Sequence, residues 1–215
     1  MDYTILALLA GRIAPFRAPD EPSAIAKQPV DGPVSIGIEG FSGDEQADRK
    51  HHGGPDKAIH HYAFDHYATW AEELGDHPLL AVPGGFGENI STSGLTEADV
   101  LLGDRFRLGT ALIEVSHGRQ PCWKLGHRFG HAPMVARIVK NRRSGWYYRV
   151  LEPGVAQAGD RLTLVERGLE AWPVDRLFHV LIGGGHKADP AVLPHLAALP
   201  VLAQAWRERA GELQA

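Results

Sequence analysis

The chain has 215 residues and a mass of 23.4 kDa, which is enough for one large domain, or one domain with a small appendage, around a buried core. Its formal net charge of -4 argues against a general nucleic-acid-binding protein, which would have a clear basic excess. No apolar stretch reaches the length of a membrane span, and Asp2 stands where a signal peptide would have a basic residue. With one cysteine and no export signal, the sequence predicts a cytoplasmic protein.

The N-terminal part of the chain is predicted to be mainly β-structure. After the first strand, the prolines between Pro15 and Pro29 predict an irregular segment. Short apolar or alternating runs bounded by turn residues predict strands over 3–9, 34–38, 58–62, 111–116, 146–151 and 161–166.

Two helices are predicted among these strands. One covers 66–74, with Asp65 as its N-cap and Gly75 directly after its end. The other covers 133–140, where apolar residues recur at helical spacing.

After Arg167 the pattern becomes helical, which predicts a boundary at this point. The first helix covers 174–182, the second begins at Asp189-Pro190, and the third begins at Pro200. Three helices this short need one another, or the preceding part of the chain, to be stable.

Cys122 is the only cysteine, so it has no partner for an intramolecular disulfide. Arg119 and Lys124 flank it and His117 lies just upstream, and such cations favour the thiolate, which binds soft metals or attacks electrophiles. A free cysteine is also commonly packed as a small buried side chain. These residues alone leave both interpretations open.

The loop 49–57 is rich in lysine, histidine and glycine, which suits an anionic ligand such as a phosphate. A solvated basic loop is the alternative. A zinc site made of His51, His52, His60 and His61 does not match a standard ligand spacing.

Two glycine-rich segments differ from known phosphate-binding motifs. The segment 84–89 lacks the third glycine and the helix of a dinucleotide-binding motif, but Asn89 offers a donor and an acceptor to the edge of a heterocycle. The run Gly183–Gly185 lacks the strand and the hydroxyl residue of a phosphate loop, and a turn between helices explains it.

Five motifs follow one another along the chain: residues 49–58, 85–90, 103–107 and 121–125, and 163–167 followed by the helical tail. In this order they resemble the YiiM-type branch of the MOSC family, whose name stands for molybdenum cofactor sulfurase C-terminal domain. The resemblance implies a mainly β fold with α-helices: a MOSC-type β-barrel with flanking helices over 1–167 and a small three-helix domain over 168–215.

The cofactor implied by the resemblance is the molybdenum cofactor, a molybdopterin with a phosphate and a molybdenum atom. Cys122 matches the family cysteine and would be the metal ligand. The residues that would bind the phosphate and the pterin, or line the same pocket, are Lys50, His51, His52, Lys57, Asn89, Arg119 and Lys124.

The activity implied by the resemblance is reduction of N-hydroxylated bases such as 6-hydroxylaminopurine, a detoxification role. Cys122 would act with His51 or His117 as the proton donor, and a separate reductase would supply electrons. The alternative is a cofactor-binding or sulfur-carrier module without turnover of its own. Neither nucleic acid nor a membrane is an expected partner, and a homodimer is compatible with the sequence.

Overall fold

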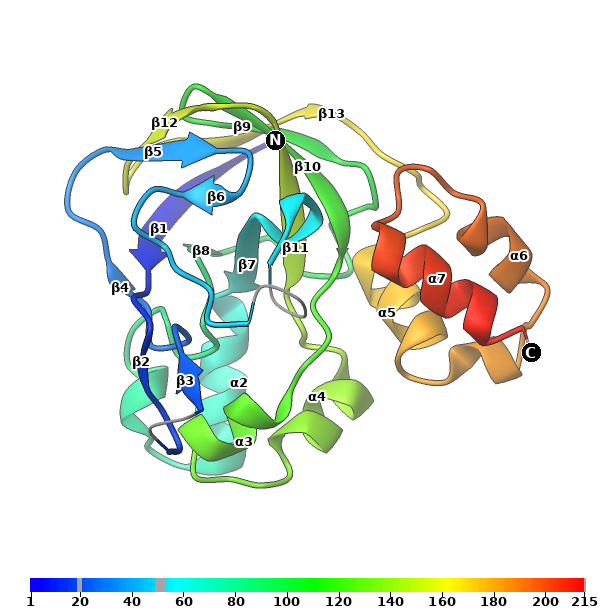
Figure 1. Cartoon of the computed structure of the whole chain (residues 1–215), viewed down its shortest axis with the longest axis horizontal. Helices are drawn as coiled ribbons and strands as arrows, with labels where there is room; N and C mark the ends of the chain where they lie inside the picture. Colours follow the sequence, from blue (N-terminus) through cyan, green and yellow to red (C-terminus); the bar gives the residue numbers. More distant parts are fainter. Residues whose placement is uncertain (19–20, 49–52, 215) are drawn as a thin grey trace.

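The computed structural model describes residues 1–18, 21–48 and 53–214. A closed β-barrel forms its centre (Figure 1). Within the described ranges, seven strands follow one another around it in the order β13-β9-β10-β11-β7-β8-β1, and pairing of β1 with β13 closes the ring. Their bounds are Asp2–Ala10 (β1), Ile59–Ala63 (β7), Ile90–Thr92 (β8), Arg105–Leu108 (β9), Ala111–Gly118 (β10), Trp146–Glu152 (β11) and Arg161–Glu166 (β13).

Antiparallel pairing dominates the barrel, and only the β7–β8 pair is parallel among the strands listed above. The segment predicted to be irregular contains three two-residue strands, a hairpin of β2 with β3 and a strand β4 that pairs with β1. A further small sheet has the order β12-β5-β6. The bounds are Ala14–Pro15 (β2), Pro22–Ser23 (β3), Gln28–Pro29 (β4), Val34–Gly37 (β5), Gly40–Phe41 (β6) and Gly154–Ala156 (β12).

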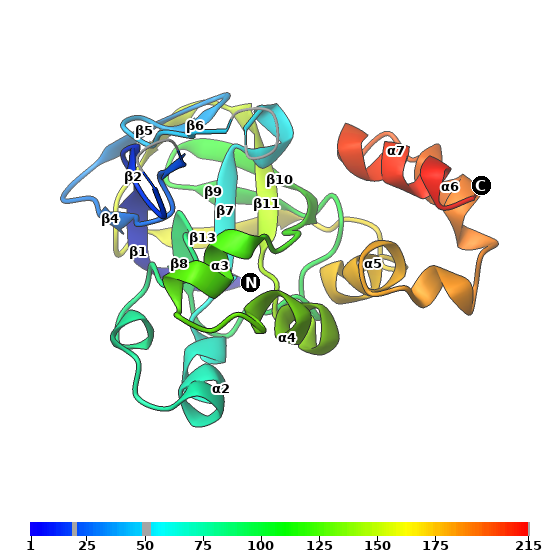
Figure 2. The same ribbon diagram turned by 60° about the horizontal axis from the view of Figure 1, so that its bottom comes forward.

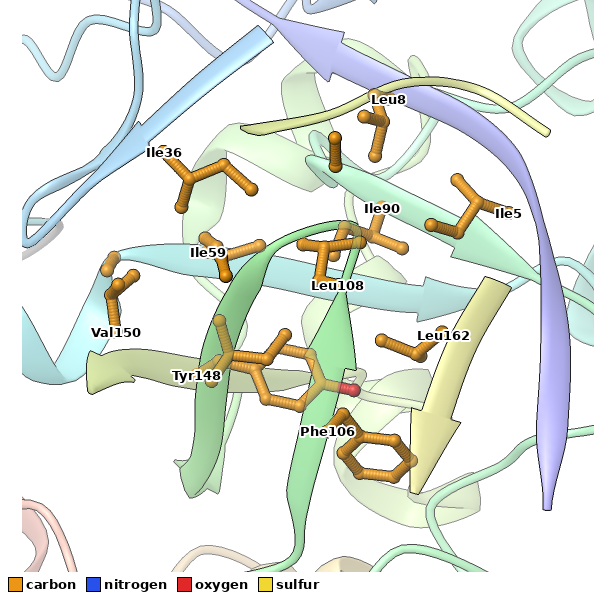
Figure 3. Packing of buried hydrophobic residues seen from close by; sticks show 14 of the residues in the cluster. Ile5, Leu8, Ile36, Ile59, Ile90, Phe106, Leu108, Tyr148, Val150 and Leu162 are labelled. Carbon is orange, nitrogen blue, oxygen red and sulfur yellow. The ribbon is translucent and has the colours of Figure 1, made fainter. Parts of the chain in front are cut away.

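Aliphatic and aromatic side chains fill the barrel (Figure 3). Ile5, Ile90, Phe106 and Leu162 come from four different strands and are all buried. Since alternate strand residues face the same side of a sheet, each strand contributes every second side chain to this core.

Helices lie below the barrel and beside it (Figures 1 and 2). Those at the lower end in Figure 1 are α2, α3 and α4; those beside the barrel are α5, α6 and α7, which form the C-terminal part of the chain. Their bounds are Asp65–Leu74 (α2), Trp123–Arg128 (α3), Met134–Asn141 (α4), Val174–Leu181 (α5), Val192–Ala197 (α6) and Gln204–Glu212 (α7), with single turns at Pro55–Lys57 (η1), Pro78–Leu80 (η2) and Gly185–Lys187 (η3).

The predicted type of these helices is right, but several of their ends differ. Asp65 is the first residue of α2 and not its N-cap, because its carboxylate accepts a hydrogen bond from the distant Gly94 N–H (2.9 Å). The last helix begins at Gln204, four residues after Pro200, where the Ala203 N–H donates to the carbonyl of Ser116 in β10 (3.1 Å). Contacts between distant segments therefore decide where these helices begin.

The helix α6 begins at Val192, later than the predicted start at Asp189-Pro190, and Pro190 instead accepts a turn hydrogen bond from Leu193 (3.1 Å). The helix α3, directly after Cys122, was not predicted. No helix in the described part of the chain is both long and apolar enough to cross a membrane.

The C-terminal helices share a buried apolar cluster with the helices below the barrel. Leu177 and Trp206 belong to the same cluster as Tyr62 and Leu125. Gly118 of β10 lies against α5 and α7, where a Cβ would stand 3.2 Å from Trp206 and 3.4 Å from Val174. The domain boundary between 167 and 168 stays a prediction.

The barrel also contains the buried, titratable side chains of His61 and Tyr148. His61 lies in β7, and its ring nitrogens are 3.0 Å from the Tyr148 hydroxyl and 2.9 Å from the Thr92 hydroxyl. Burial lowers the pKa of His61 to about 3. The ring is therefore neutral in the folded protein at pH values well above 3.

We expect this histidine to make the protein less stable in acid. In the unfolded chain His61 takes up a proton near pH 6.5, and in the folded chain only near pH 3. The contribution of His61 to the free energy of unfolding is therefore fully present above pH 6.5 and is lost by about 1.4 kcal/mol per pH unit between pH 6.5 and 3. Urea unfolding between pH 7 and 4 measures this slope. His61→Gln should reduce it by about that amount, and an unchanged slope would contradict the assignment.

Candidate functional site

The candidate site is a cleft at the end of the barrel next to α3. Of the residues singled out from the sequence, it brings together Lys57, Asn89, Arg119, Cys122 and Lys124. They come from the end of η1, the residue before β8, the residue after β10, the N-cap of α3 and its first turn. Residues far apart in the chain therefore meet around one thiol.

Cys122 is half-buried and lines this cleft, so it is not a side chain sealed in the core. Strand β10 ends at Gly118, and the next residue, Arg119, donates its backbone N–H to Gly145 (2.9 Å), which holds the turn. The chain then starts α3, with the Leu125 N–H donating to the Cys122 carbonyl (3.1 Å). The end of a barrel strand and the start of a helix thus place the thiol at the cleft.

Among the described lysines and arginines predicted for the site, Arg119 is the most deeply buried, with 6% of its surface exposed. Its Nη1 has no hydrogen-bond partner among the residues that the structure describes. A buried N–H without a partner costs free energy, and an anionic ligand in the cleft would supply the missing acceptor. His60 also lines the cleft, and its Nε2 is likewise buried without a described partner.

Lys27 is a further cation of the cleft that the sequence reasoning missed. Its ammonium forms a buried ion pair with Asp44, which also accepts the Gly11 N–H (2.7 Å). Burial lowers the pKa of Lys27, which the carboxylate of Asp44 partly opposes. No motif marks Lys27 in the sequence, because only the folding of the proline-rich segment brings it here.

Asn89 supports the wall of the cleft with all of its polar atoms. Its Nδ2 donates to the carbonyl of Leu9 (3.1 Å) and to Asp44 (2.8 Å), and its Oδ1 accepts the backbone N–H of His60 (3.0 Å). Both amide hydrogens are therefore used within the protein. Asn89 therefore has no free N–H to donate to the edge of a heterocycle, contrary to the expectation from the sequence.

The glycine-rich segment 84–89 is shaped by a buried carboxylate. Glu88 accepts the backbone N–H groups of Gly84 (2.7 Å) and Phe86 (3.0 Å) and the hydroxyl of Tyr67. Gly87 has φ 77°, and a Cβ there would lie 2.6 Å from Ile25 Cγ1. Glycine is thus required at this position for close packing, and the segment presents only Phe86, Gly87 and Asn89 to the cleft.

Lys57 and Lys124 complete the cationic lining. Burial lowers the pKa of Lys57, while the carboxylates of Asp48 and Asp56 act in the opposite direction. A lowered pKa makes an ammonium a readier proton donor.

His117, predicted as a proton donor, lies in a second cleft that also reaches Cys122. Burial, together with the charges of Lys57 and Arg149, holds the pKa of His117 well below its usual value. The ring is therefore neutral near pH 7 and has no imidazolium proton to give. Lys50, His51 and His52 lie outside the described residues, so their roles stay predictions.

The zinc alternative required His60 and His61 to bind one metal together. They are consecutive residues of β7 and face opposite sides, His60 the cleft and His61 the barrel interior. Within the described ranges, no group of three or more histidine, cysteine or acidic residues is placed to hold a metal ion.

Comparison with known proteins agrees with this barrel. The model of the MOSC domain matches residues 48–163, so the chain belongs to the MOSC family. The crystal structure of YiiM from Geobacillus stearothermophilus superimposes with a TM-score of 0.82 at 34% identity and covers 99% of this chain and 100% of that one. The protein is accordingly a MOSC-domain protein of the YiiM type.

Two relatives are similar in sequence over a shorter span. Protein YiiM of Escherichia coli K12 is 47% identical over 147 residues, which are 68% of this chain and 66% of that protein. A protein named reductase from Gibberella moniliformis is 40% identical over 172 residues, 79% of this chain but only 30% of its own length.

The MOSC domain is related to molybdenum cofactor sulfurase, and the residues of the first cleft fit an anionic cofactor of this kind. Nη1 of buried Arg119 has no acceptor among the described residues, and the cleft also holds Lys27, Lys57 and Lys124, beside the carboxylates of Asp44, Glu45 and Asp48. The thiol of Cys122 would be a soft ligand for the molybdenum of such a cofactor.

We expect the Lys27–Asp44 pair to hold this cleft together. Asp44→Ala would leave a buried ammonium without its partner and should lower the free energy of unfolding by about 3–5 kcal/mol. The control is Glu152→Ala, which breaks an exposed pair with Arg107 (2.7 Å) and should cost less than about 1 kcal/mol. Urea unfolding measures both, and equal losses would contradict the role of Asp44.

Proposed function

We propose that the protein is a molybdenum-cofactor-dependent reductase of N-hydroxylated bases and related N-hydroxylated compounds. The observation that supports this most is the position of Cys122, half-buried where a cationic cleft meets a second, aromatic one. Membership of the MOSC family and a relative named reductase agree with a redox enzyme.

In this proposal Cys122 is the protein ligand of the metal, and Arg119, Lys57, Lys27 and Lys124 balance the negative charge of the cofactor. When bound, the cofactor supplies the two-electron reduction that cleaves an N–O bond. The overall reaction takes R–NHOH, two electrons and two protons to R–NH₂ and water. The electrons come from a separate reductase.

We assign Lys57 as the proton donor of the site. It lines both clefts, and burial lowers the pKa of its ammonium. Neutral His117 does not fill this role. His51 keeps its predicted role as an alternative donor, outside the described residues.

Cys122→Ala and Cys122→Ser test the metal ligand. We expect both variants to fold with an unchanged melting temperature within a few degrees, to lose bound molybdenum on elemental analysis, and to lose reduction of 6-hydroxylaminopurine with an artificial electron donor. Wild-type protein that contains molybdenum but reduces no N-hydroxylated base would sink the enzyme proposal. It would favour the cofactor-binding or sulfur-carrier alternative instead.

Lys57→Arg and Lys57→Gln separate proton donation from charge. Arginine keeps the positive charge but does not release a proton near neutral pH, so we expect kcat to fall about 100-fold or more in both variants, with molybdenum content retained in Lys57→Arg. Full activity of Lys57→Arg would show that only the charge of Lys57 matters. Molybdenum content and kcat are measured on the same preparations.

A further inference from the structure

A second cleft opens beside Cys122, between the cysteine loop and α7. It shares Asp48, Lys57, Cys122 and Tyr147 with the cationic cleft. Its remaining described lining is His117, Gln120, Pro121, Trp123, Ala205, Trp206 and Arg209. The two clefts therefore meet at the thiol, and the second is bounded on one side by α7.

A β-bulge sets the orientation of His117 in this cleft. The register of β10 against β11 shifts between Val115 and His117, which leaves Ser116 as the extra residue and pairs His117 with Tyr147. The two rings stack with centroids 5.2 Å apart and an interplanar angle of 28°. Trp206 of α7 packs edge-on against His117 at 5.4 Å.

The hydrogen bonds of Ser116 determine which nitrogen of His117 has the proton. Ser116 Oγ lies 2.6 Å from the carbonyl of Asp56, 3.1 Å from the carbonyl of Tyr147 and 3.0 Å from His117 Nδ1. A carbonyl only accepts, so the single hydroxyl proton of Ser116 goes to Asp56. His117 Nδ1 must then be the donor to Oγ.

His117 Nε2 is consequently a lone-pair acceptor. It has no hydrogen bond to any described residue, and the ring, of which 1% is exposed, lines the second cleft. The pKa of the ring, lowered by burial, agrees with the neutral form that this arrangement requires.

We propose that the second cleft binds the ring of the substrate, a flat heteroaromatic base, and that His117 Nε2 accepts a hydrogen bond from the exocyclic N–H or O–H of that base. This inference rests on the proposed function and adds a residue that selects the substrate. Trp123, which is 43% exposed, offers aromatic surface to the base, and Trp206, which is 4% exposed, supports the ring of His117. The acceptor favours a base with an exocyclic donor. The helix α7 thereby becomes part of the substrate site.

Binding of two unreactive bases to the purified full-length chain tests this inference by calorimetry. Adenine has an exocyclic amine, whereas 6-methylpurine has a methyl group of similar size and no donor there. We expect the wild-type protein to bind adenine about 3- to 10-fold more tightly, the usual net effect of one neutral hydrogen bond. His117→Phe keeps an aromatic ring without the acceptor and should bind both bases equally.

His117→Gln places a polar amide near the same position and should restore part of the preference for adenine. Trp172→Phe is the control, because Trp172 lies in the C-terminal region outside this cleft, packed against His195. It should leave both affinities unchanged. If His117→Phe weakened the binding of adenine and of 6-methylpurine by the same factor, the preference for adenine would remain. The residue would then be structural only, and the inference would be overturned.

This test is independent of turnover. With active protein, we also expect His117→Phe to raise the KM for 6-hydroxylaminopurine about 3- to 10-fold with little change in kcat. An unchanged KM in an active enzyme would overturn the inference and leave the proposed function standing. A donor-dependent affinity in a protein without reductase activity would support the base-binding cleft and contradict the proposed function.

Discussion

The closure of the barrel by the β1–β13 pair is the constraint on which the other parts of the structure depend. This antiparallel pairing joins Asp2–Thr4 to Arg161–Thr163, strands that are far apart in the sequence. Once the ring is closed, every strand has two neighbours, and the loops at its end are held at fixed positions. The cysteine loop after β10, η1 before β7 and Asn89 before β8 meet at one cleft in this way.

The first cleft is lined by the cations Lys27, Lys57, Arg119 and Lys124 and by the carboxylates of Asp44, Glu45 and Asp48. Lys27 is paired with Asp44, but Arg119 has a polar atom without a partner in the described part of the protein. Buried charges are normally paired, because desolvation is costly. The departure of Arg119 from this rule, next to a half-buried thiol, is what the proposed anionic cofactor would explain.

The two clefts around Cys122 differ in their chemistry. The first is cationic and the second is lined by aromatic rings and a neutral histidine. A cofactor and a substrate make different demands, and a thiol at the junction of both clefts is where they would meet. Packing of Trp206 against His117 connects the helical part of the chain to this arrangement.

The sequence by itself determined the main β-strands, the type of most helices and the identity of Cys122, Lys57, Arg119 and Lys124 as cleft residues. Those features depend on local patterns and on motifs, which are readable along the chain. Only the tertiary structure decided that Lys27 joins the site, that the side-chain amide of Asn89 is fully hydrogen-bonded within the protein, and that burial lowers the pKa of His117. The physical reason is that burial and hydrogen-bond partners belong to residues distant in sequence: Asp44 for Lys27 and Asn89, Asp56 and Tyr147 for the serine beside His117.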